Sequence, residues 1–367
     1  MSSKNDSLFD TPASERFNLV ERISATTLSQ VWHAKRIKDD KEFTIKQTKL
    51  FVKENFVSPS VFHELSLLGE VNYPHIIRPY LNEISFDFKK EQVSFCFENH
   101  LTNVQKIVRY YKKKNEVIPL VAAKSILFQL LLAIDYLHYR KIAHCNVIPA
   151  NLVLVPEKDR IPGILKLMDF GYSRIIEDAG NQRSLNVVHP WYRAPEVLLG
   201  DTTYDKSIDI WACGCVFAEI LTGNVLFGSK KKETNGELNN ITQLLRITRI
   251  LGPITEVDCA HPLYCVNFQQ FMQNQPMDTK NVLVSIISST PEALDLLTKM
   301  LQYNALKRIT AREALSHPFF SKEPLCETNI VGLFPKKEWN SINHLQARPP
   351  QTQSLNTRSH VAEANQS

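Results

Sequence analysis

The segment KIAHCNVIPANLVL, residues 141–154, sets the polar side chains of His144, Asn146 and Asn151 among mainly apolar neighbours. Eighteen residues beyond Asn151 the chain reads LMDFG, so Asp169 follows a second apolar run. Carboxylate and amide oxygens are ligands that hard cations such as Mg²⁺ prefer. Their residue types make Asn151 and Asp169 candidate metal ligands, and the rest of the chain is interpreted outward from them.

Hydrophobic periodicity divides the chain into a β-rich part and a helical part. Alternation predicts four strands and helical spacing predicts one helix among them, at 17–23, 29–37, 41–48 and 93–99 and at 60–71 respectively. From about residue 101, long apolar segments such as 120–140 and 207–223 predict helices. We therefore predict an α+β fold with a small β-rich N-lobe and a larger helical C-lobe.

The predicted domain boundaries follow this division. They are an N-terminal extension at 1–16, a domain at 17–320 with its N-lobe at about 17–97 and its C-lobe at about 101–320, and a C-terminal extension at 321–345. Residues 346–367 are rich in Gln, Ser, Asn, Thr and Pro, a composition that predicts a disordered tail.

Composition and charge exclude few classes of function. The 367 residues are 43% hydrophobic and 22% charged, as is usual for soluble globular proteins. The net charge of +5 does not require a nucleic acid partner. The seven cysteines form no CxxC pair, which predicts a reducing compartment. We expect neither a membrane nor direct nucleic acid contact.

Further motifs lie in a fixed order on both sides of the opening segment. Lys46 ends FTIK, and Glu64 lies in FHELSLL on the predicted N-lobe helix. Downstream come APE at 194–196, Asp209 in SIDIWACGC and Arg308 in KRITA. Each match is weak alone, and two surface charges would explain Lys46 and Glu64. All of them in the correct order resemble the protein kinase superfamily.

This resemblance implies the bilobal protein-kinase fold, in which the N-lobe helix is regulatory. It implies that Lys46 holds the phosphates of ATP and that Arg308 pairs with Glu196. His144 and Asn146 fall at the catalytic position, where kinases have an Asp that accepts the substrate's proton. ATP and Mg²⁺ are the possible cofactors. The implied cofactor-binding residues are Ser24, Val31, Lys46, Glu64, Glu98, Asn151 and Asp169, with Asn151 and Asp169 as metal ligands.

The resemblance is closest to the cyclin-dependent kinase family, through WYRAPEVLLG, YDKSIDIWACGCVFAEILTG and LGPITEVD. Within that family the Mediator-associated, cyclin-C-dependent type is similar in HAKRIKDDKEFTIKQ, SPSVFHELSLL and FPKKEW. The similarity runs from about residue 13 to 341. It implies a cyclin-C-like partner bound at SPSVFHELSLL, a possible place in the Mediator kinase module, transcription regulation, and a nuclear location with the cytoplasm as second option.

The stretch SATTLSQV matches the glycine-rich loop of kinases in position but contains none of its glycines. Ser24, Thr26 and Ser29 stand where its three glycines are expected. Glycine serves there because its backbone approaches phosphates closely and reaches positive φ, whereas all three replacements carry a Cβ. The substitutions predict that this loop no longer grips ATP phosphates in the usual way.

Four more departures fall on the transfer step. Asn146 replaces the catalytic Asp, and an amide orients a hydroxyl but cannot take its proton. General-base assistance contributes roughly 10²–10⁴ in rate. Cys145, Ile148 and His189 stand where the family has an Arg, a Lys and a Thr.

Two classes of function follow from these departures. The first is a catalytically dead or strongly impaired pseudokinase that acts by binding a cyclin-like partner. The second is a weakly active ATP-dependent protein serine/threonine kinase, because phosphoryl transfer relies mainly on positioning and charge. Lys46, Glu64 and Asp169 can persist either to hold nucleotide or to hold the architecture, so nucleotide binding stays open. Transfer of another group from the nucleotide would need a new nucleophile or base, and Cys145 is the one candidate that the sequence offers.

Overall fold

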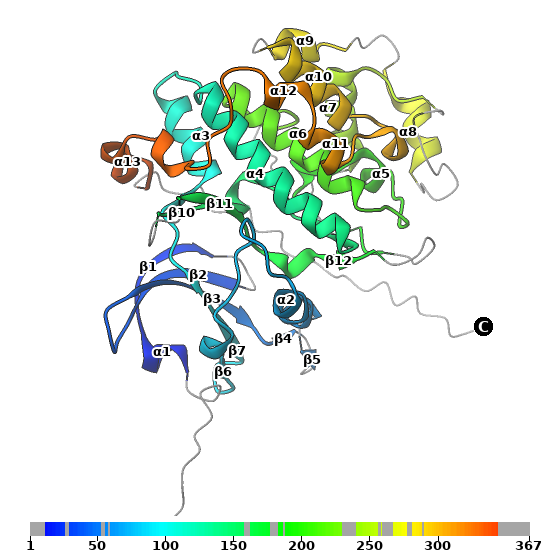
Figure 1. Ribbon diagram of the computed structural model, residues 1–367. Coiled ribbons are helices and arrows are strands. Elements are labelled where there is room, and N and C mark those ends of the chain that lie inside the picture. The colour runs from blue at the N-terminus through cyan, green and yellow to red at the C-terminus, as the bar shows by residue number, and fades with distance from the viewer. Residues whose placement is uncertain are drawn as a thin grey trace, which may run out of the picture.

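Two lobes make up this computed structural model, with the helical lobe above the sheet lobe in Figure 1. The structure describes residues 12–25, 29–52, 56–57, 59–157, 162–176, 183–185, 188–229, 240–255, 258, 267–276, 281–287 and 290–343. The predicted disordered tail, most of the N-terminal extension and Thr26 lie outside the described residues.

The N-lobe is built on a five-stranded antiparallel sheet in the order β1-β2-β3-β7-β6. Its strands are β1 (Phe17–Ala25), β2 (Ser29–Arg36), β3 (Glu42–Lys49), β7 (Gln92–Glu98) and β6 (Ser85–Asp87). Helix α1 (Ala13–Arg16) precedes them, α2 (Pro59–Glu70) lies beside them, and β4 (Phe51–Val52) pairs with β5 (Phe56–Val57). The predicted β-rich N-lobe with one main helix is therefore confirmed.

The C-lobe is mainly helical and carries short strands on the side that faces the N-lobe (Figure 1). Its helices are α3 (Val104–Lys113), α4 (Leu120–Tyr139), α5 (Pro195–Leu198), α6 (Ser207–Thr222), α7 (Asn240–Leu251), α8 (Phe268–Asn274), α9 (Leu283–Ile286), α10 (Pro291–Met300), α11 (Ala311–Leu315), α12 (Pro318–Ser321) and α13 (Trp339–Asn343). Its strands are β8 (Thr102–Asn103), β9 (Ile142–Ala143), β10 (Leu152–Val155), β11 (Ile164–Leu167) and β12 (Arg174–Ile175).

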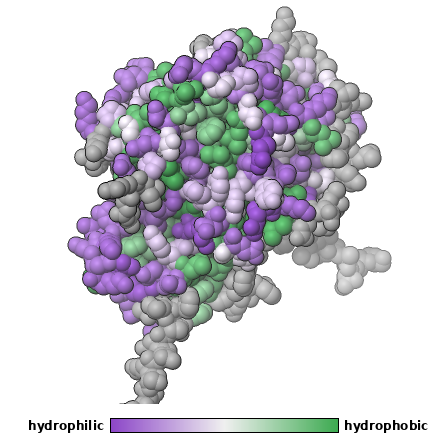
Figure 2. Space-filling model, in the orientation of Figure 1, coloured by the Kyte–Doolittle hydropathy of each residue, from purple (hydrophilic) through white to green (hydrophobic). Residues whose placement is uncertain are grey.

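Helix α4 is the centre of the C-lobe and packs against α6 and α11. Length and composition alone make it the one helix in the described part of the chain that could cross a membrane. Most of its residues are buried against the rest of the lobe, as in the core helix of a folded domain. Figure 2 shows hydrophobic residues on the surface mostly over the helical lobe, while the left side of the sheet lobe is hydrophilic.

Strand β3 sends alternate side chains to opposite faces of the sheet, as the period of two requires. Phe43 and Ile45 pack into a small core with Phe17, on the face away from the C-lobe. Thr44 and Lys46 lie on the other face, from which Lys46 reaches Asp169 of the C-lobe. This face of the sheet and the C-lobe residues opposite it are called the cleft below. The alternation thereby directs two polar side chains of one strand into the cleft.

Candidate functional site

The Lys46 ammonium joins three segments of the chain at the inner end of the cleft. Its Nζ lies 2.8 Å from both carboxylate oxygens of Glu64 on α2, and 2.8 Å from Oδ1 of Asp169 after β11. Glu64 is only 3% exposed. Lys46 and Glu64 therefore form a buried ion pair, and the same ammonium also ties the N-lobe to the C-lobe.

Burial and charge act in opposite directions on these three groups. Burial disfavours the Lys46 ammonium, but the attraction of Asp169 and Glu64 outweighs it and raises the Lys46 pKa. Burial raises the pKa of Glu64, against the attraction of Lys46. Burial also opposes ionisation of Asp169, yet Lys46 lowers the pKa of that carboxyl overall. The cluster is stable only as a whole, because each carboxylate depends on one shared cation.

The side chain of Asn146 is hydrogen-bonded to the second carboxylate oxygen of Asp169. The Asn146 Nδ2 donates to Asp169 Oδ2 at 2.7 Å, and the Asn151 Nδ2 donates to the Asn146 carbonyl at 2.9 Å. The predicted catalytic position and the two predicted metal ligands are thus brought together. They are bonded to one another, with the amide nitrogens of both asparagines turned inward.

This arrangement does not fit Mg²⁺. A hard cation needs several oxygen ligands with available lone pairs, but the two oxygens of Asp169 already accept hydrogen bonds from Lys46 and Asn146. The described residues contain no group of three or more His, Cys, Asp or Glu side chains that could hold a metal ion. A metal at Asp169 would have to share these oxygens with the ammonium and the amide, or displace them.

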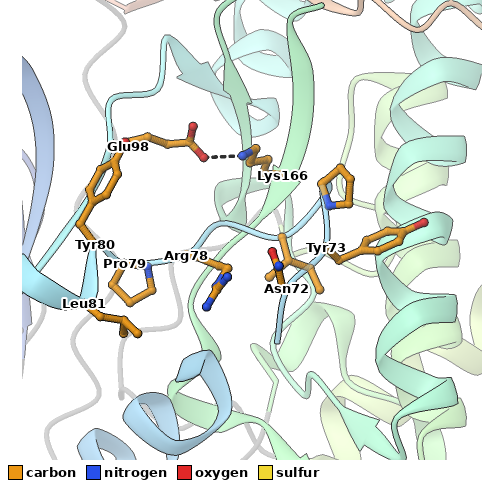
Figure 3. Close-up of a pocket in the computed structure, with 10 residues that line it drawn as sticks. Asn72, Tyr73, Arg78, Pro79, Tyr80, Leu81, Glu98 and Lys166 are labelled. Atoms are coloured by element: carbon orange, nitrogen blue, oxygen red, sulfur yellow. Dashed lines mark hydrogen bonds and ion pairs between the residues drawn. The ribbon is translucent and has the colours of Figure 1, made fainter. Parts of the chain in front are cut away.

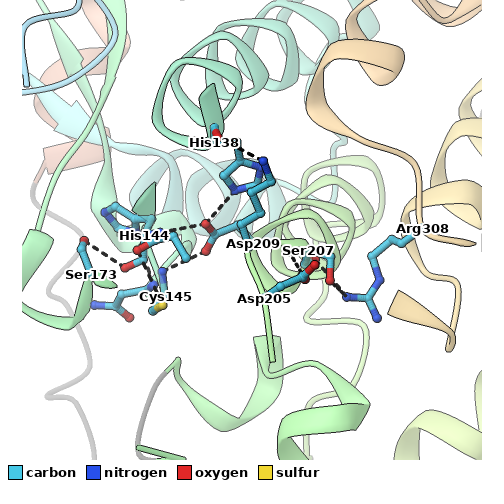
Figure 4. A network of polar contacts seen from close by, with 11 residues as sticks. His138, His144, Cys145, Ser173, Asp205, Ser207, Asp209 and Arg308 are labelled. Atoms are coloured by element: carbon cyan, nitrogen blue, oxygen red, sulfur yellow. Dashed lines mark hydrogen bonds and ion pairs between the residues drawn. The ribbon is translucent and has the colours of Figure 1, made fainter. Parts of the chain in front are cut away.

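Asp209 fixes the backbone of the catalytic-loop segment (Figure 4). Its carboxylate accepts the backbone N–H of His144 and of Cys145, each at 2.8 Å, and lies 3.0 Å from Nε2 of His138. Cys145 has a φ of 59°, in the left-handed region. Burial, with Asp209 nearby, raises the pKa of its thiol well above the usual value. Cys145 is therefore a structural thiol rather than a nucleophile.

His144 supports the turn that follows Asp169, at Phe170–Tyr172. Its ring meets Phe170 edge-on at 4.8 Å between centroids, and its carbonyl accepts the Ser173 hydroxyl at 3.2 Å. The backbone N–H of Asn146 donates to His144 Nδ1 at 3.3 Å. The ring thus positions the neighbouring backbone, and no substrate contact is needed to explain it.

The side chains of Ile148 and His189, two further departures from the family pattern, supply no positive charge to the transfer site. Ile148 is half-buried against the apolar core. His189 packs edge-on against Trp191 and accepts that residue's backbone N–H at 3.4 Å. His189 is solvent-exposed. Partial desolvation and the nearby Arg193 lower its pKa, so the ring is mainly neutral at pH 7. Neither side chain replaces the cation that the family has beside the transferring phosphate.

The remaining predicted nucleotide contacts are spread over the sheet. Val31 lies opposite Lys46 on β2, and Ser24 lies opposite Val31 on β1. Glu98 lies opposite Phe43, on the face away from Lys46. Its carboxylate pairs with Lys166 at 2.5 Å and borders a separate pocket of about 500 Å³ (Figure 3). The Glu98 carboxylate is therefore not part of the cluster around Lys46.

Thr44 and His100 are cleft residues that the sequence reasoning missed. Thr44 Oγ1 lies 3.1 Å from Nδ1 of His100, in the segment that follows β7. The alternation in FTIK was a usable signal for Thr44, because it places that residue on the face of Lys46. His100 had no such signal, since ENHLT reads as a polar connection.

Comparison with known proteins agrees with this geometry. The family model described as "Protein kinase domain" matches residues 17–320. Cyclin-dependent kinase E-1 of Arabidopsis thaliana is 33% identical, over 85% of this chain and 67% of that protein. Cyclin-dependent kinase B2-2 of Arabidopsis thaliana is 31% identical, over 85% and 95%. Cell division control protein 2 homolog D of Antirrhinum majus is 30% identical, over 84% and 95%. The chain therefore belongs to the protein kinase family and is related to its cyclin-dependent kinases.

Proposed function

We propose that this chain is a cyclin-dependent-kinase-like pseudokinase that acts by binding a cyclin-C-like partner, in the Mediator kinase module and in the nucleus. One observation carries the proposal. Asn146 donates its amide to Asp169, so the position of the proton acceptor and the position of the metal ligand are bonded to each other. A working site needs both groups turned toward substrate and metal.

The chemistry of the departures supports loss of transfer. The Asn146 amide has no basic site for a substrate proton, and Ile148 and the neutral His189 supply no charge for a phosphate in flight. The buried Cys145 offers no substitute nucleophile. The parts that remain intact all have architectural roles in this structure.

The intact contacts support a binding role. Lys46 holds Glu64 and therefore fixes α2 against the C-lobe. Glu196 and Arg308 form a buried bidentate pair at 2.9 and 3.1 Å, which fixes the APE motif at 194–196 to the C-lobe. The sequence resemblance implies that the partner binds at α2, and two of the relatives are cyclin-dependent kinases by name. A rigid α2 is the element that such a partner needs.

Exposed apolar side chains near α2 fit a partner surface. The turn Phe170–Tyr172 packs on α2, and its Tyr172 is 46% exposed. Ile175, three residues further on in β12, is 55% exposed. Large apolar side chains at the surface are typical contact residues of protein interfaces. We therefore place the edge of the partner interface at Tyr172 and Ile175.

Substitution of Ile175 by Glu tests that interface. We expect Ile175→Glu to weaken binding of a purified cyclin C by at least about 10-fold, because a carboxylate would be desolvated in an apolar contact. Leu306→Glu is the matched control, since Leu306 is 73% exposed on the C-lobe. Biolayer interferometry measures both. Equal affinity for the two variants, or no binding of the cyclin by the unmodified chain, would contradict the proposal.

Phosphoryl transfer separates the proposal from its alternative. The surviving Lys46, Glu64 and Asp169 favour a weakly active serine/threonine kinase as the second candidate. With radiolabelled ATP, Mg²⁺, cyclin partner and a peptide substrate, we expect no transfer above the blank. Transfer that disappears in Asp169→Ala would establish the alternative and overturn the pseudokinase.

A further inference from the structure

The contact between Thr44 and His100 crosses the cleft side of the N-lobe sheet. Thr44 is fully buried, and its hydroxyl lies 3.1 Å from the imidazole Nδ1 of His100. The two residues are 56 positions apart in the chain, so this bond ties the segment that connects the lobes to the middle of β3. The imidazole therefore lies against the face of β3 that looks into the cleft.

His100 is half-buried where the connecting segment meets the sheet. Burial, with Lys106 on α3 and His33 on β2 nearby, lowers its pKa to about 4. Its ring is neutral at pH 7, and it has Thr44 as a hydrogen-bond partner. The ring is consequently a fixture of the cleft wall, drawn in from the connecting segment.

The position of Thr44 relative to Lys46 decides what this ring obstructs. They are two residues apart on one face of β3, a spacing of about 7 Å. In the sheet, Thr44 lies between His33 and Phe97, and Lys46 lies between Val31 and Phe95. A kinase lysine at the Lys46 position binds the α- and β-phosphates. Ser29, at the start of β2 where the phosphate-covering loop of kinases is expected, lies opposite Thr48. The nucleoside part of a nucleotide held at Lys46 therefore extends the other way along β3, over Thr44.

We infer that His100, held by Thr44, fills the nucleoside part of the cleft and closes it to adenine nucleotides. The inference deepens the proposed pseudokinase function and rests on it. It concerns the opposite end of the cleft from the bond between Asn146 and Asp169. ATP binding, which the family resemblance implies, would thus be blocked at His100. This residue lies outside the catalytic motifs.

Adenosine is the probe that tests this end alone, because it carries no phosphate and requires no metal. We expect no binding by the wild-type chain and at least about 10-fold higher affinity in His100→Ala. A closed state populated ten times more than the open one reduces apparent affinity by that factor. Thr44→Ala removes only the hydrogen bond and gives a smaller gain. His317→Ala is the matched control, because His317 pairs with Asp295 in the C-lobe, away from this sheet, and it leaves the affinity unchanged.

Saturation-transfer NMR with adenosine and thermal-shift titration with ATP in EDTA provide the readouts. Wild-type affinity equal to that of His100→Ala would overturn the inference, and so would a cooperatively folded His100→Ala that does not bind. If His100→Ala does not unfold cooperatively, Thr44→Ala decides in the same way. Cyclin C binding by each variant is measured in parallel. If the variants still bind cyclin C while the adenosine result contradicts the inference, only the closed cleft is wrong and the proposed partner function stands.

Discussion

Lys46→Met is expected to lower the free energy of unfolding by about 3–5 kcal/mol, the usual cost of removing one partner from a buried ion pair. The methionine fills the volume of the lysine stem but removes the cation that lies between Glu64 and Asp169, which are both 2.8 Å from Nζ. Glu64, at 3% exposure, has no access to water that would solvate its charge. The buried Glu64 carboxylate and the partly exposed Asp169 carboxylate would then face each other without the cation between them.

The loss in Lys46→Met should depend on pH in a defined direction. Without Lys46, burial and the charge of Asp169 both act on the Glu64 carboxyl and hold its folded-state pKa above the unfolded value. A group with a raised folded pKa stabilises the fold below its unfolded pKa, and that stability is lost as pH rises through the folded pKa. We therefore expect the deficit of Lys46→Met to be larger at pH 8 than at pH 5.

Urea unfolding at the two pH values measures this effect. Lys299→Met is the matched control, because Lys299 pairs with Asp295 on an exposed helix turn and such pairs contribute about 0–1 kcal/mol. Similar losses for the two variants, or a Lys46→Met deficit that grows toward acid, would contradict the role assigned to the cluster.

Much of this architecture was predictable because its residue types have few alternative uses. A bidentate Arg–carboxylate pair needs one fixed geometry, so Glu196 and Arg308 were assignable to each other through the family resemblance. Lys46 and Glu64 were assigned to the site through motif order, because two surface charges would have explained each residue alone. These predictions depended on local periodicity and motif order, which a sequence displays directly.

The contacts that close the cleft were not predictable in the same way. Asn146 was recognised as a lost base, but the direction of its amide depends on where Asp169 lies after folding. His100 finds Thr44 only because β7 places the connecting segment beside β3. Polar side chains in short connections have several possible partners, and tertiary packing selects among them.

Backbone conformations of the catalytic segment persist although its chemistry is impaired. Cys145 and Asp169 have φ of 59° and 71°, in the left-handed region, where a non-glycine residue costs on the order of 1–3 kcal/mol. Asp209 holds one of these residues through its backbone N–H, and Lys46 and Asn146 hold the other through its carboxylate. Hydrogen bonds thus maintain the kinase shape of the loop without nucleotide or metal.

Asn146→Asp is expected to make the stability of this chain depend on Mg²⁺. The amide nitrogen that donates to Asp169 at 2.7 Å is replaced by a second carboxylate oxygen, so a hydrogen bond becomes a repulsive contact between like charges. Leaving a buried polar group without its partner costs about 1–3 kcal/mol, and more for a charged group. In EDTA, Asn146→Asp should therefore melt below the wild-type chain.

Added Mg²⁺ should reverse that loss in the variant alone. The carboxylate that the substitution introduces, together with Asp169 and the amide oxygen of Asn151, would present the set of oxygen ligands that the wild-type arrangement lacks. A ligand at 100 times its dissociation constant stabilises by about 2.7 kcal/mol, enough to offset most of the loss. Wild type should give no shift with Mg²⁺, because Lys46 and Asn146 occupy the oxygens of Asp169.

Asn146→Ala is the control that separates lost hydrogen bonding from added charge. It removes the donor without adding a carboxylate, so it should lower the melting temperature in EDTA and show no recovery with Mg²⁺. Differential scanning fluorimetry of the three proteins, with EDTA and with excess MgCl₂, measures these effects. Equal Mg²⁺ responses in wild type and Asn146→Asp would mean that Asp169 is available to metal in the natural chain. The bond between Asn146 and Asp169 would then not be what closes the metal site, and the weakly active kinase would gain support over the pseudokinase.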